Sequence, residues 1–422
     1  MYDVPDKRVQ NDTCISSDER ENRVTEVQPK GNVPALRFPE FSGEWMIKTI
    51  NDLATVIGGG TPDTTIKSYW DGNIQWFTPS EIGKSKYINL SSRTITEEGL
   101  KNSSAKLLPP YTILLSSRAT VGECSITLQE CATNQGFQSL IAKSCDIDFL
   151  YYLIQTKKKD LIRKACGSTF LEISANEVRK IHTNVPSNAE QKKIGALLSL
   201  VDNRIEVQNK IIEDLKKLKS AISKHLFARK DLLETTICLS NIATLKNGYA
   251  FQSGKYNALG KWKILTITNV PGERYINDED CNCIINLPND IQDHQVLKEG
   301  DILISLTGNV GRVSLCKNGD YLLNQRVGLL QLAKNVNREF LYQILSSQRF
   351  ENSMTACGQG AAQMNIGKGD VESFVLPYSS NGNNILWVAK ILHSYDERII
   401  NELRRLTLLT MQKQYLLTQM FI

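Results

Sequence analysis

The chain has 422 residues, of which 41% are hydrophobic and 23% charged. This composition is that of a globular protein, and at about 150 residues per domain the length predicts about three domains. The apolar runs are strand-sized and the polar first residues lack a signal core, so we expect no membrane span and no export. Ten cysteines are too few for a disulfide scaffold, which favours reduced thiols and a cytoplasmic location. The net charge of +5 permits nucleic-acid binding without requiring it.

The first 35 residues differ from the rest of the chain. Residues 1–35 are polar and show no helical or strand periodicity. A segment of this kind cannot bury enough apolar surface to order itself. We therefore expect a mobile N-terminal tail, with the folded part beginning at residue 36.

The rest of the chain repeats once, with an offset of about 190 residues. Residues 113–116 (ILLS) return at 302–305 (ILIS), and Asn134-Gln135 returns as Asn324-Gln325. Each copy begins with short apolar segments separated by Gly, Asn, Pro and Thr turns, and ends in a long helical pattern. Two copies are too few for a solenoid and predict two modules related by a pseudo-two-fold.

This repeat predicts an α+β fold with two β-rich domains, each followed by a long helix. The two helices are expected to form an antiparallel coiled coil, which follows naturally from the pseudo-two-fold. The expected boundaries are the first β-rich domain at 36–187, the first helix at 188–230, the second β-rich domain at 231–381 and the second helix at 382–422.

The helices are the clearest local prediction. Ser187-Asn188-Ala189-Glu190 has the S-x-x-E form of a capping box, and an apolar 3-4 lattice follows it. Polar residues interrupt the lattice at Gln208 and Lys219, and at Glu402 and Lys413 in the second copy. Matching interruptions favour pairing of the two helices, although each stripe could instead pack on its own domain. The apolar seam comprises Leu198, Val201, Ile205, Ile212, Leu215, Ile222 and Leu226, with Leu392, Tyr395, Ile399, Leu406, Leu409 and Leu416.

Signals of catalysis and metal binding are missing. Gly367-Lys368-Gly369 lacks the remainder of a phosphate-binding loop, the four histidines are scattered, and Cys281-Asn282-Cys283 is too tight for a zinc pair. Leu108-Pro109-Pro110-Tyr111 is similar to the [DN]-P-P-Y motif of amino-methyltransferases, but Leu108 cannot accept a hydrogen bond from a target amine. We therefore expect no catalytic residue and no metal or cofactor in this chain.

The two modules match in framework and differ at their loop tips. Arg118 corresponds to Thr307, and Ser80 corresponds to Thr268. Equal scaffolds with unequal polar tips suit an asymmetric DNA site with two half-sites, where Arg and Asn read base edges and Lys holds phosphates. The candidate DNA contacts are Thr61, Lys67, Ser80, Lys84, Arg93, Arg118 and Thr120 in the first module, and Tyr249, Lys255, Thr268, Asn269, Asn309 and Arg326 in the second.

Several motifs together resemble the specificity subunit of a type I restriction–modification system. They are the opening Val33–Trp45, the Gly58–Pro62 turn with the following Tyr69-Trp70, the Asn134–Phe137 element, the Glu190–Ile194 helix start and the duplication itself. The second helix departs from the pattern, because it begins at Asn383-Asn384-Ile385 without the Glu-Gln pair. Partner docking at that end is therefore expected to be weaker or differently made.

The resemblance implies two target-recognition domains that each read one half of a split double-stranded DNA site. It also implies that two methyltransferase subunits, which carry S-adenosylmethionine and flip the target adenine, dock on this chain, and that restriction subunits, which use ATP, join them. Such a subunit has no catalytic residue of its own. Two alternatives stay open: a methyltransferase with a fused recognition domain, and a protein-interaction scaffold that does not bind DNA.

Overall fold

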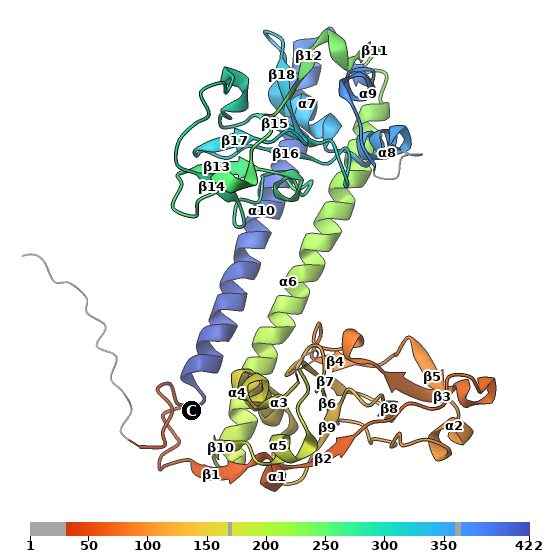
Figure 1. Cartoon of the computed structure of the whole chain (residues 1–422), viewed down its shortest axis with the longest axis vertical. Helices are drawn as coiled ribbons and strands as arrows, with labels where there is room; N and C mark the ends of the chain where they lie inside the picture. Colours follow the sequence, from red (N-terminus) through yellow and green to blue (C-terminus); the bar gives the residue numbers. More distant parts are fainter. Residues whose placement is uncertain (1–30, 168–170, 359–363) are drawn as a thin grey trace, which may run out of the picture. The chain divides into compact units, whose positions relative to one another are not determined.

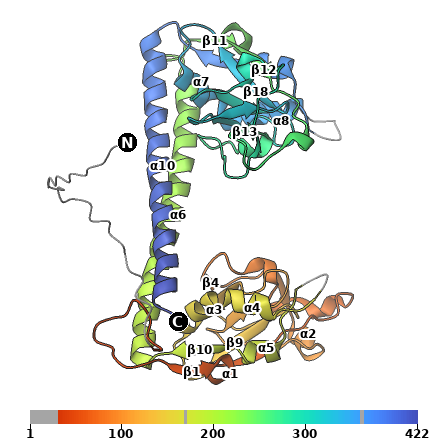
Figure 2. The same ribbon diagram turned by 60° about the vertical axis from the view of Figure 1, so that its left-hand side comes forward.

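The computed structural model describes residues 31–167, 171–358 and 364–422. The chain divides into two compact units, each with one β-rich domain and a part of both long helices (Figures 1 and 2). Unit 1 comprises the described residues up to Asp202 together with Gln412–Ile422, and unit 2 comprises Asn203–Met411. The division passes through the helices, whereas the expected domain boundaries lie at the helix ends.

Unit 1 contains a five-stranded sheet in the order β2-β9-β6-β7-β4, a three-stranded sheet β5-β3-β8 and the pair β1-β10. Its strands are β1 Met46–Thr49, β2 Ala54–Gly58, β3 Trp70–Phe77, β4 Tyr87–Ile88, β5 Arg93–Ile95, β6 Ile113–Leu115, β7 Cys124–Thr127, β8 Cys131–Thr133, β9 Gln138–Ala142 and β10 His182–Val185. Its helices are α1 Ile50–Leu53, η1 Lys67–Tyr69, η2 Pro79–Glu81, α2 Glu97–Lys101, α3 Ile147–Thr156, α4 Lys158–Lys164 and α5 Ala175–Arg179, before the long α6 Asn188–Ala228.

Unit 2 contains a four-stranded sheet in the order β12-β18-β15-β16, a three-stranded sheet β14-β13-β17 and the pair β11-β19. Its strands are β11 Thr235–Cys238, β12 Ala243–Asn247, β13 Trp262–Leu265, β14 Asn282–Ile284, β15 Ile302–Ser305, β16 Val313–Leu315, β17 Tyr321–Leu323, β18 Val327–Leu332 and β19 Val375–Tyr378. Its helices are η3 Leu239–Asn241, η4 Ser253–Lys255, η5 Ile267–Asn269, η6 Asp293–Gln295, α7 Arg338–Leu345, α8 Gln348–Cys357 and α9 Lys368–Glu372, before the long α10 Gly382–Gln419.

Apart from the added edge strand β4 of unit 1, the two units have the same strand order, which confirms the internal repeat and the α+β fold. In both, a parallel pair (β3 with β8, β13 with β17) lies beside antiparallel neighbours. The central strands β6 and β15 are buried at every position. Because both of their faces are covered, these strands read as continuous apolar runs without alternation.

The first long helix begins at the predicted residue but with different contacts. The backbone N–H of Glu190 donates to the Ser187 hydroxyl at 3.4 Å, which is one half of the capping box. The Glu190 carboxylate does not return to Ser187. It accepts both arms of Arg37 at 2.8 Å and the indole N–H of Trp45 at 3.3 Å. The expected reciprocal box is therefore wrong at its second half, because a buried ion pair takes the carboxylate.

The contacts of residues 32–36 correct the extent of the predicted tail. Residues 1–30 lie outside the described part of the chain, but residues 32–34 are half-buried or buried. The carbonyl of Asn32 accepts the Trp45 N–H at 2.7 Å, Pro34 is buried, and the Leu36 N–H donates to Gln419 on α10 at 2.9 Å. The Trp45 ring lies edge-on to Phe149 and Phe421. The folded part thus begins before residue 36.

The two long helices lie antiparallel and contact each other through the predicted seam. In unit 2, Gln208 donates to the carboxylate of Glu402 at 2.7 Å, and Lys219 donates to Asp396 at 2.5 Å. In unit 1, Lys413 pairs with Asp202 at 2.8 Å. All the predicted seam residues are buried or half-buried. The alternative in which each stripe packs only on its own domain is therefore wrong, whereas coiled-coil supercoiling stays a prediction.

Two findings concern the whole described chain. None of the described helices is long and apolar enough to cross a membrane. Among the same residues, no group of three or more His, Cys, Asp or Glu side chains lies close enough together to hold a metal ion.

Candidate nucleic-acid interface

In unit 1, five loops meet at one end of the sheets and form a continuous polar edge, here called edge 1. The central loop, 134–136, and the strand end before it form backbone hydrogen bonds with the neighbouring loops on both sides. Asn134 N–H donates to Phe77 at 3.1 Å, Gly60 N–H donates to Thr133 at 2.8 Å, and Ser117 N–H donates to Gly136 at 2.8 Å. The Ile173 N–H then donates to Ser117 at 3.0 Å. Edge 1 comprises residues 59–61, 78–80, 116–120, 134–136 and 172–173.

Unit 2 builds the equivalent edge 2 with the same backbone hydrogen bonds. Asn324 N–H donates to Leu265 at 3.2 Å, Tyr249 N–H donates to Leu323 at 2.8 Å, and Leu306 N–H donates to Arg326 at 3.0 Å. The Ile366 N–H donates to Leu306 at 2.9 Å. Edge 2 comprises residues 248–250, 266–268, 306–309, 324–326 and 364–366. Backbone geometry is therefore repeated while the side chains differ.

One glycine in each edge permits this arrangement. A Cβ on Gly59 would lie 2.0 Å from the Asn134 carbonyl oxygen, and a Cβ on Gly248 would lie 2.2 Å from the Asn324 carbonyl oxygen. Both obstacles are backbone atoms, which cannot rotate away. The repeated glycine is thus required by a close approach of two loops, and a nucleotide site is not needed to explain it.

The repeated Asn-Gln pair divides into a structural and an exposed residue. The Asn134 side chain accepts the Gly136 N–H at 2.8 Å, and Asn324 accepts the Arg326 N–H at 3.2 Å, so that both asparagines close an Asx turn. Gln135 and Gln325 are exposed at the tips of the same turns. Glutamine can bond bidentately to adenine, and these two residues were missed among the candidates although their repetition was visible.

Asn269 is a structural residue, which corrects its selection as a base reader. Its side-chain oxygen accepts the Thr266 N–H and hydroxyl at 2.8 and 2.9 Å. Its amide nitrogen donates to the Asn277 carbonyl at 2.9 Å, and the residue is buried. Glu81 caps Thr78 in the same way in unit 1. A buried amide with both ends bonded has no free group for DNA.

The other candidates fall into two groups. On the edges lie Thr61, Ser80, Arg118 and Thr120 in unit 1, and Tyr249, Thr268, Asn309 and Arg326 in unit 2. Some of these already have partners: Thr61 donates to Gln135 at 2.5 Å, the Arg118 Nε pairs with Glu172 at 2.8 Å, and the Tyr249 hydroxyl donates to Asp290 at 2.8 Å. Arg118 keeps 43% of its side chain exposed, and Asn309 and Arg326 are exposed.

Four basic candidates lie outside the bonded loops. Lys67 precedes β3, whose opposite end carries edge 1 about 26 Å away for an eight-residue strand. The Arg93 guanidinium stacks 3.6 Å from the centre of the Trp70 ring. Lys84 is exposed on the loop after η2, and Lys255 is exposed at the end of η4. The structure does not bring these residues into either edge, and their contact with DNA stays a prediction.

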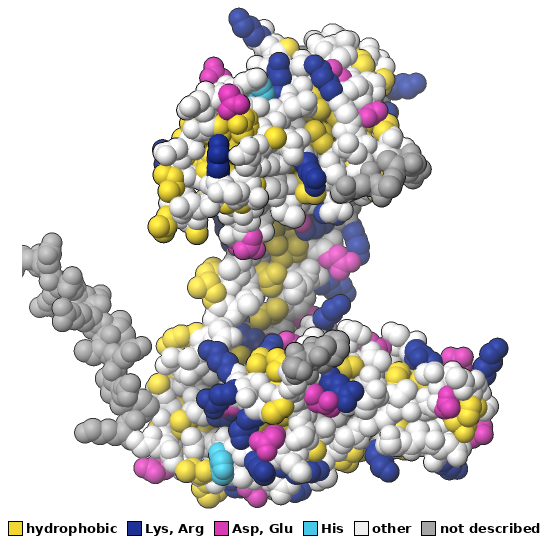
Figure 3. Space-filling view, viewed as in Figure 1, with side chains coloured by type: hydrophobic (Ala, Val, Ile, Leu, Met, Phe, Trp, Pro, Cys, Tyr) yellow, Lys and Arg dark blue, Asp and Glu magenta, His cyan; other side chains and the backbone are white. Residues whose placement is uncertain are grey.

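Both edges expose hydrogen-bonding groups of the kind that recognise a ligand. Exposed amides, hydroxyls and guanidinium groups can donate to base edges and phosphates. In Figure 3 the visible faces of both units carry Lys and Arg side chains interspersed with acidic ones. The faces seen in this view therefore carry mixed charge and not a single basic surface.

Comparisons with known proteins agree with this interpretation. The family model described as "Type I restriction modification DNA specificity domain" matches residues 42–217 and 234–409. The MjaIX specificity subunit of Methanocaldococcus jannaschii is 39% identical over 189 residues, 44% of each chain. A type I restriction enzyme specificity subunit of Escherichia coli is 28% identical over 206 residues, 47% of this chain and 50% of that protein. The chain thus spans about half the length of these two relatives.

Two solved structures share the fold. The S subunit of a type I restriction-modification system from M. genitalium has a TM-score of 0.56 at 18% identity and covers 92% of this chain and 99% of that chain. A chain from a study of complex assembly and conformational transition of the type I R-M system has a TM-score of 0.57 at 15% identity, covering 90% and 97%. Since the family model matches both repeats and most of the sequence, this chain belongs to the type I restriction modification DNA specificity domain family.

Proposed function

We propose that this chain is the DNA-recognition subunit of a type I restriction–modification complex and reads a split, asymmetric double-stranded DNA site. The observation that carries the proposal is the pair of edges with the same backbone and different exposed side chains. Each edge reads one half of the site, because bases are distinguished by side-chain donors and acceptors and not by the shared backbone.

The differences between the edges indicate unequal half-sites. Arg118 in edge 1 stands where edge 2 has the nearly buried Thr307, which donates to Asn365 at 3.0 Å. Edge 2 has its own exposed cation at Arg326, in the position that the buried Gly136 takes in edge 1. A guanidinium that bonds bidentately to guanine contributes about 1–3 kcal/mol of discrimination. The two cations therefore read at different places within their half-sites.

The helix pair supports the proposed docking of partners. In unit 2, apart from the first two turns of α10, six large apolar side chains project to solvent from α6 and α10, and Figure 3 shows yellow side chains along this helical stretch. Exposed apolar side chains in this number are typical of a protein interface. They are Val207, Ile211, Leu218, Leu403, Leu408 and Met411.

In the proposed complex two methyltransferase subunits bind at these helices and restriction subunits join them. S-adenosylmethionine and ATP bind to those subunits, and this chain contributes sequence recognition without a catalytic residue, a cofactor or a metal. The complex acts in the cytoplasm, where the host DNA lies.

The proposal is tested by co-expressing the chain with the methyltransferase subunit from the same genome and sequencing the host DNA for methylated adenine. The expected result is one motif with two unequal halves and a fixed gap. A complex that forms but leaves the DNA unmethylated would contradict sequence recognition and favour an interaction scaffold. Methylation by the purified chain alone would instead favour a methyltransferase.

A further inference from the structure

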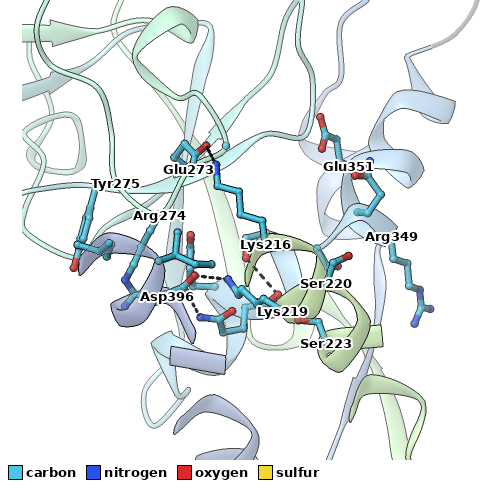
Figure 4. A pocket seen from close by; sticks show the side chains of 18 of the residues that line it. Lys216, Lys219, Ser220, Ser223, Glu273, Arg274, Tyr275, Arg349, Glu351 and Asp396 are labelled. Atoms are coloured by element: carbon cyan, nitrogen blue, oxygen red, sulfur yellow. Dashed lines mark hydrogen bonds and ion pairs between the residues drawn. The ribbon is translucent and has the colours of Figure 1, made fainter. Parts of the chain in front are cut away.

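A buried ionic network joins the β-rich domain of unit 2 to the two long helices. The Arg274 guanidinium, on the loop after η5, bonds to both carboxylate oxygens of Glu339 on α7 at 2.8 and 2.7 Å. It also donates to Asp396 on α10 at 2.9 Å, and Asp396 accepts Lys219 of α6 at 2.5 Å. Figure 4 shows Arg274, Asp396 and Lys219 converging from the domain loop and the two helices. Gln343 donates to both acids at 2.7 and 2.6 Å.

Unit 1 repeats the network with the same Lys–Asp pair between the helices and with other side chains at the positions on the domain. Lys86 stands in the place of Arg274 and pairs with Asp148 of α3 at 2.7 Å. Its ammonium group also donates to the Ser199 hydroxyl on α6 at 2.5 Å. The Tyr152 hydroxyl donates to Asp202 at 2.6 Å, and Lys413 of α10 pairs with Asp202 at 2.8 Å. Both networks therefore link a domain loop to α6 and α10.

The cation of each network is rigidly attached to its domain. The Lys86 carbonyl accepts the Ile126 N–H of β7 at 2.7 Å, and the Arg274 carbonyl accepts the Leu315 N–H of β16 at 2.8 Å. The residue before each cation is held by a buried serine of the same strand, Ser125 or Ser314. Each cation also follows six residues after an edge residue, Ser80 or Thr268. The cation and the reading edge thus belong to one hydrogen-bonded domain, so that a rigid-body movement of that domain moves both.

In unit 2 the described part of the domain attaches to the helices in two regions, and the first holds the network together with the neighbouring Lys216–Glu273 ion pair at 2.8 Å. The other is the apolar core, in which Leu226 of α6 and Val388 and Leu392 of α10 pack against the domain. Asp396 lies eight residues beyond Val388, about 12 Å along the helix. Beside Arg274, a cavity of about 1260 Å³ separates the domain loop and α8 from the helices. If the domain were attached only through the apolar core, it could rotate about that point on the helices. The network adds a second attachment point about 12 Å away, which prevents this rotation.

The buried, charge-balanced side chains of each network explain why this attachment fixes the orientation of the domain. Each network contains two cations and two carboxylates, and the Lys86, Arg274 and Asp396 side chains are 7–8% exposed. Burial lowers the pKa of Arg274, but the hydrogen bonds and charge of Glu339 outweigh this effect and raise it overall. A buried ion pair adds little net stability compared with apolar packing, but it is strongly dependent on geometry. Its retention in both units is therefore better explained by orientation than by stability.

We propose that Lys86 and Arg274 are positioning residues that fix the orientation of each reading edge on the helix pair and thereby set the gap between the two half-sites. This inference rests on the proposed DNA-recognition function. One added base pair shifts a half-site by about 3.4 Å and rotates it by about 35° around the helix axis. Only an edge held in a fixed orientation rejects such a change.

The test selects double-stranded DNA from a fully randomised 40-bp library with the full-length chain and sequences the bound fraction. Four proteins are compared: the wild type, Arg274→Met, the charge-keeping Arg274→Lys, and Lys263→Met as the matched control. Lys263 pairs with Asp278 inside the unit 2 domain at 2.7 Å and does not reach the helices. Thermal unfolding of each protein reports whether it is folded.

The wild type is expected to yield one gap length, with gaps one base pair longer or shorter at least tenfold depleted. Arg274→Met should keep both half-motifs and reduce this depletion to below threefold, with Arg274→Lys between them and Lys263→Met unchanged. An unchanged gap preference in a folded Arg274→Met protein would overturn the inference. If Arg274→Met does not fold, the gap preference of Arg274→Lys decides in the same way. Absence of any split motif in the wild type would contradict the proposed function itself.

Discussion

The two units hold the same framework together with different chemistry. Where unit 1 places the charged Glu190 at the start of its long helix, unit 2 places the neutral Asn384, which donates to the Leu232 carbonyl at 3.0 Å. Where unit 2 anchors a loop through Asp278, the equivalent residue of unit 1 is the exposed Leu90. The units share the backbone path, its required glycines, the Asx turns and the Lys–Asp pair between the helices, whereas other structural side-chain contacts have diverged. The units should therefore respond differently to equivalent substitutions.

The largest difference is expected at the helix starts. Glu190→Ala leaves the mostly buried Arg37 without its partner and should lower the free energy of unfolding by about 4 kcal/mol. Asn384→Ala removes one neutral hydrogen bond and should cost about 1 kcal/mol. Urea denaturation of both variants measures this comparison. Equal losses would show that the Arg37–Glu190 ion pair contributes no more to stability than the neutral hydrogen bond of Asn384.

The glycines of the two edges should instead behave alike. Gly59→Ala and Gly248→Ala each force a Cβ against a backbone carbonyl, and overpacking of this kind should cost about 2 kcal/mol. Gly254→Ala is the control, because nothing lies within 4 Å of the added Cβ. The same denaturation assay applies. If Gly59→Ala or Gly248→Ala is as stable as the control, the close approach of the loops is wrong.

Acid should weaken unit 2 through a group that unit 1 lacks. Hydrogen bonds from Lys263, Lys317 and Tyr321 lower the pKa of Asp278 well below its usual range. The stabilisation is present above the unfolded pKa of about 3.9 and is lost as the pH falls through the lower folded value. Asp278→Asn should cost about 1.5 kcal/mol at pH 7 and flatten the pH dependence below pH 4.

Hydrogen exchange resolved by peptide measures this effect in each unit separately. In the wild type, protection in unit 2 should fall below pH 4, and Asp278→Asn should remove that dependence. Leu90→Asn in unit 1 is the matched control and should change nothing. An identical acid response of Asp278→Asn and wild type would contradict the assignment.

The smallest effect is expected in the helix seam. Gln208 and Glu402 occupy equivalent positions of the repeat and bond to each other while nearly buried. Replacing both by Leu should change the free energy of unfolding by less than about 1 kcal/mol, because the lost hydrogen bonds are offset by apolar packing. Thermal unfolding tests this, with Gln208→Leu alone as the comparison. The single variant should be the less stable one, since it removes the amide donor on the facing helix and leaves the nearly buried Glu402 carboxylate with Arg405 alone.

The fold was predictable from the sequence because its signals are local or repeated. The 3-4 lattice identifies both long helices, and the matched interruptions at Lys219 and Lys413 indicate their pairing. Asn269 was misassigned because Thr266-x-x-Asn269 is itself a capping pattern that the prediction did not consider. The network around Arg274 could not be predicted, since its partners lie 65 and 122 residues away in the chain.

The central claim is that each edge reads its own half of the DNA site, and the exposed glutamines test it most directly. DNA is selected from a randomised library by the wild type, Gln135→Ala and Gln325→Ala, and the bound motifs are compared. The account predicts that each variant loses about tenfold discrimination in one half only, a different half for each, with the gap unchanged. Loss in both halves from either substitution, or in the same half from both, would contradict it.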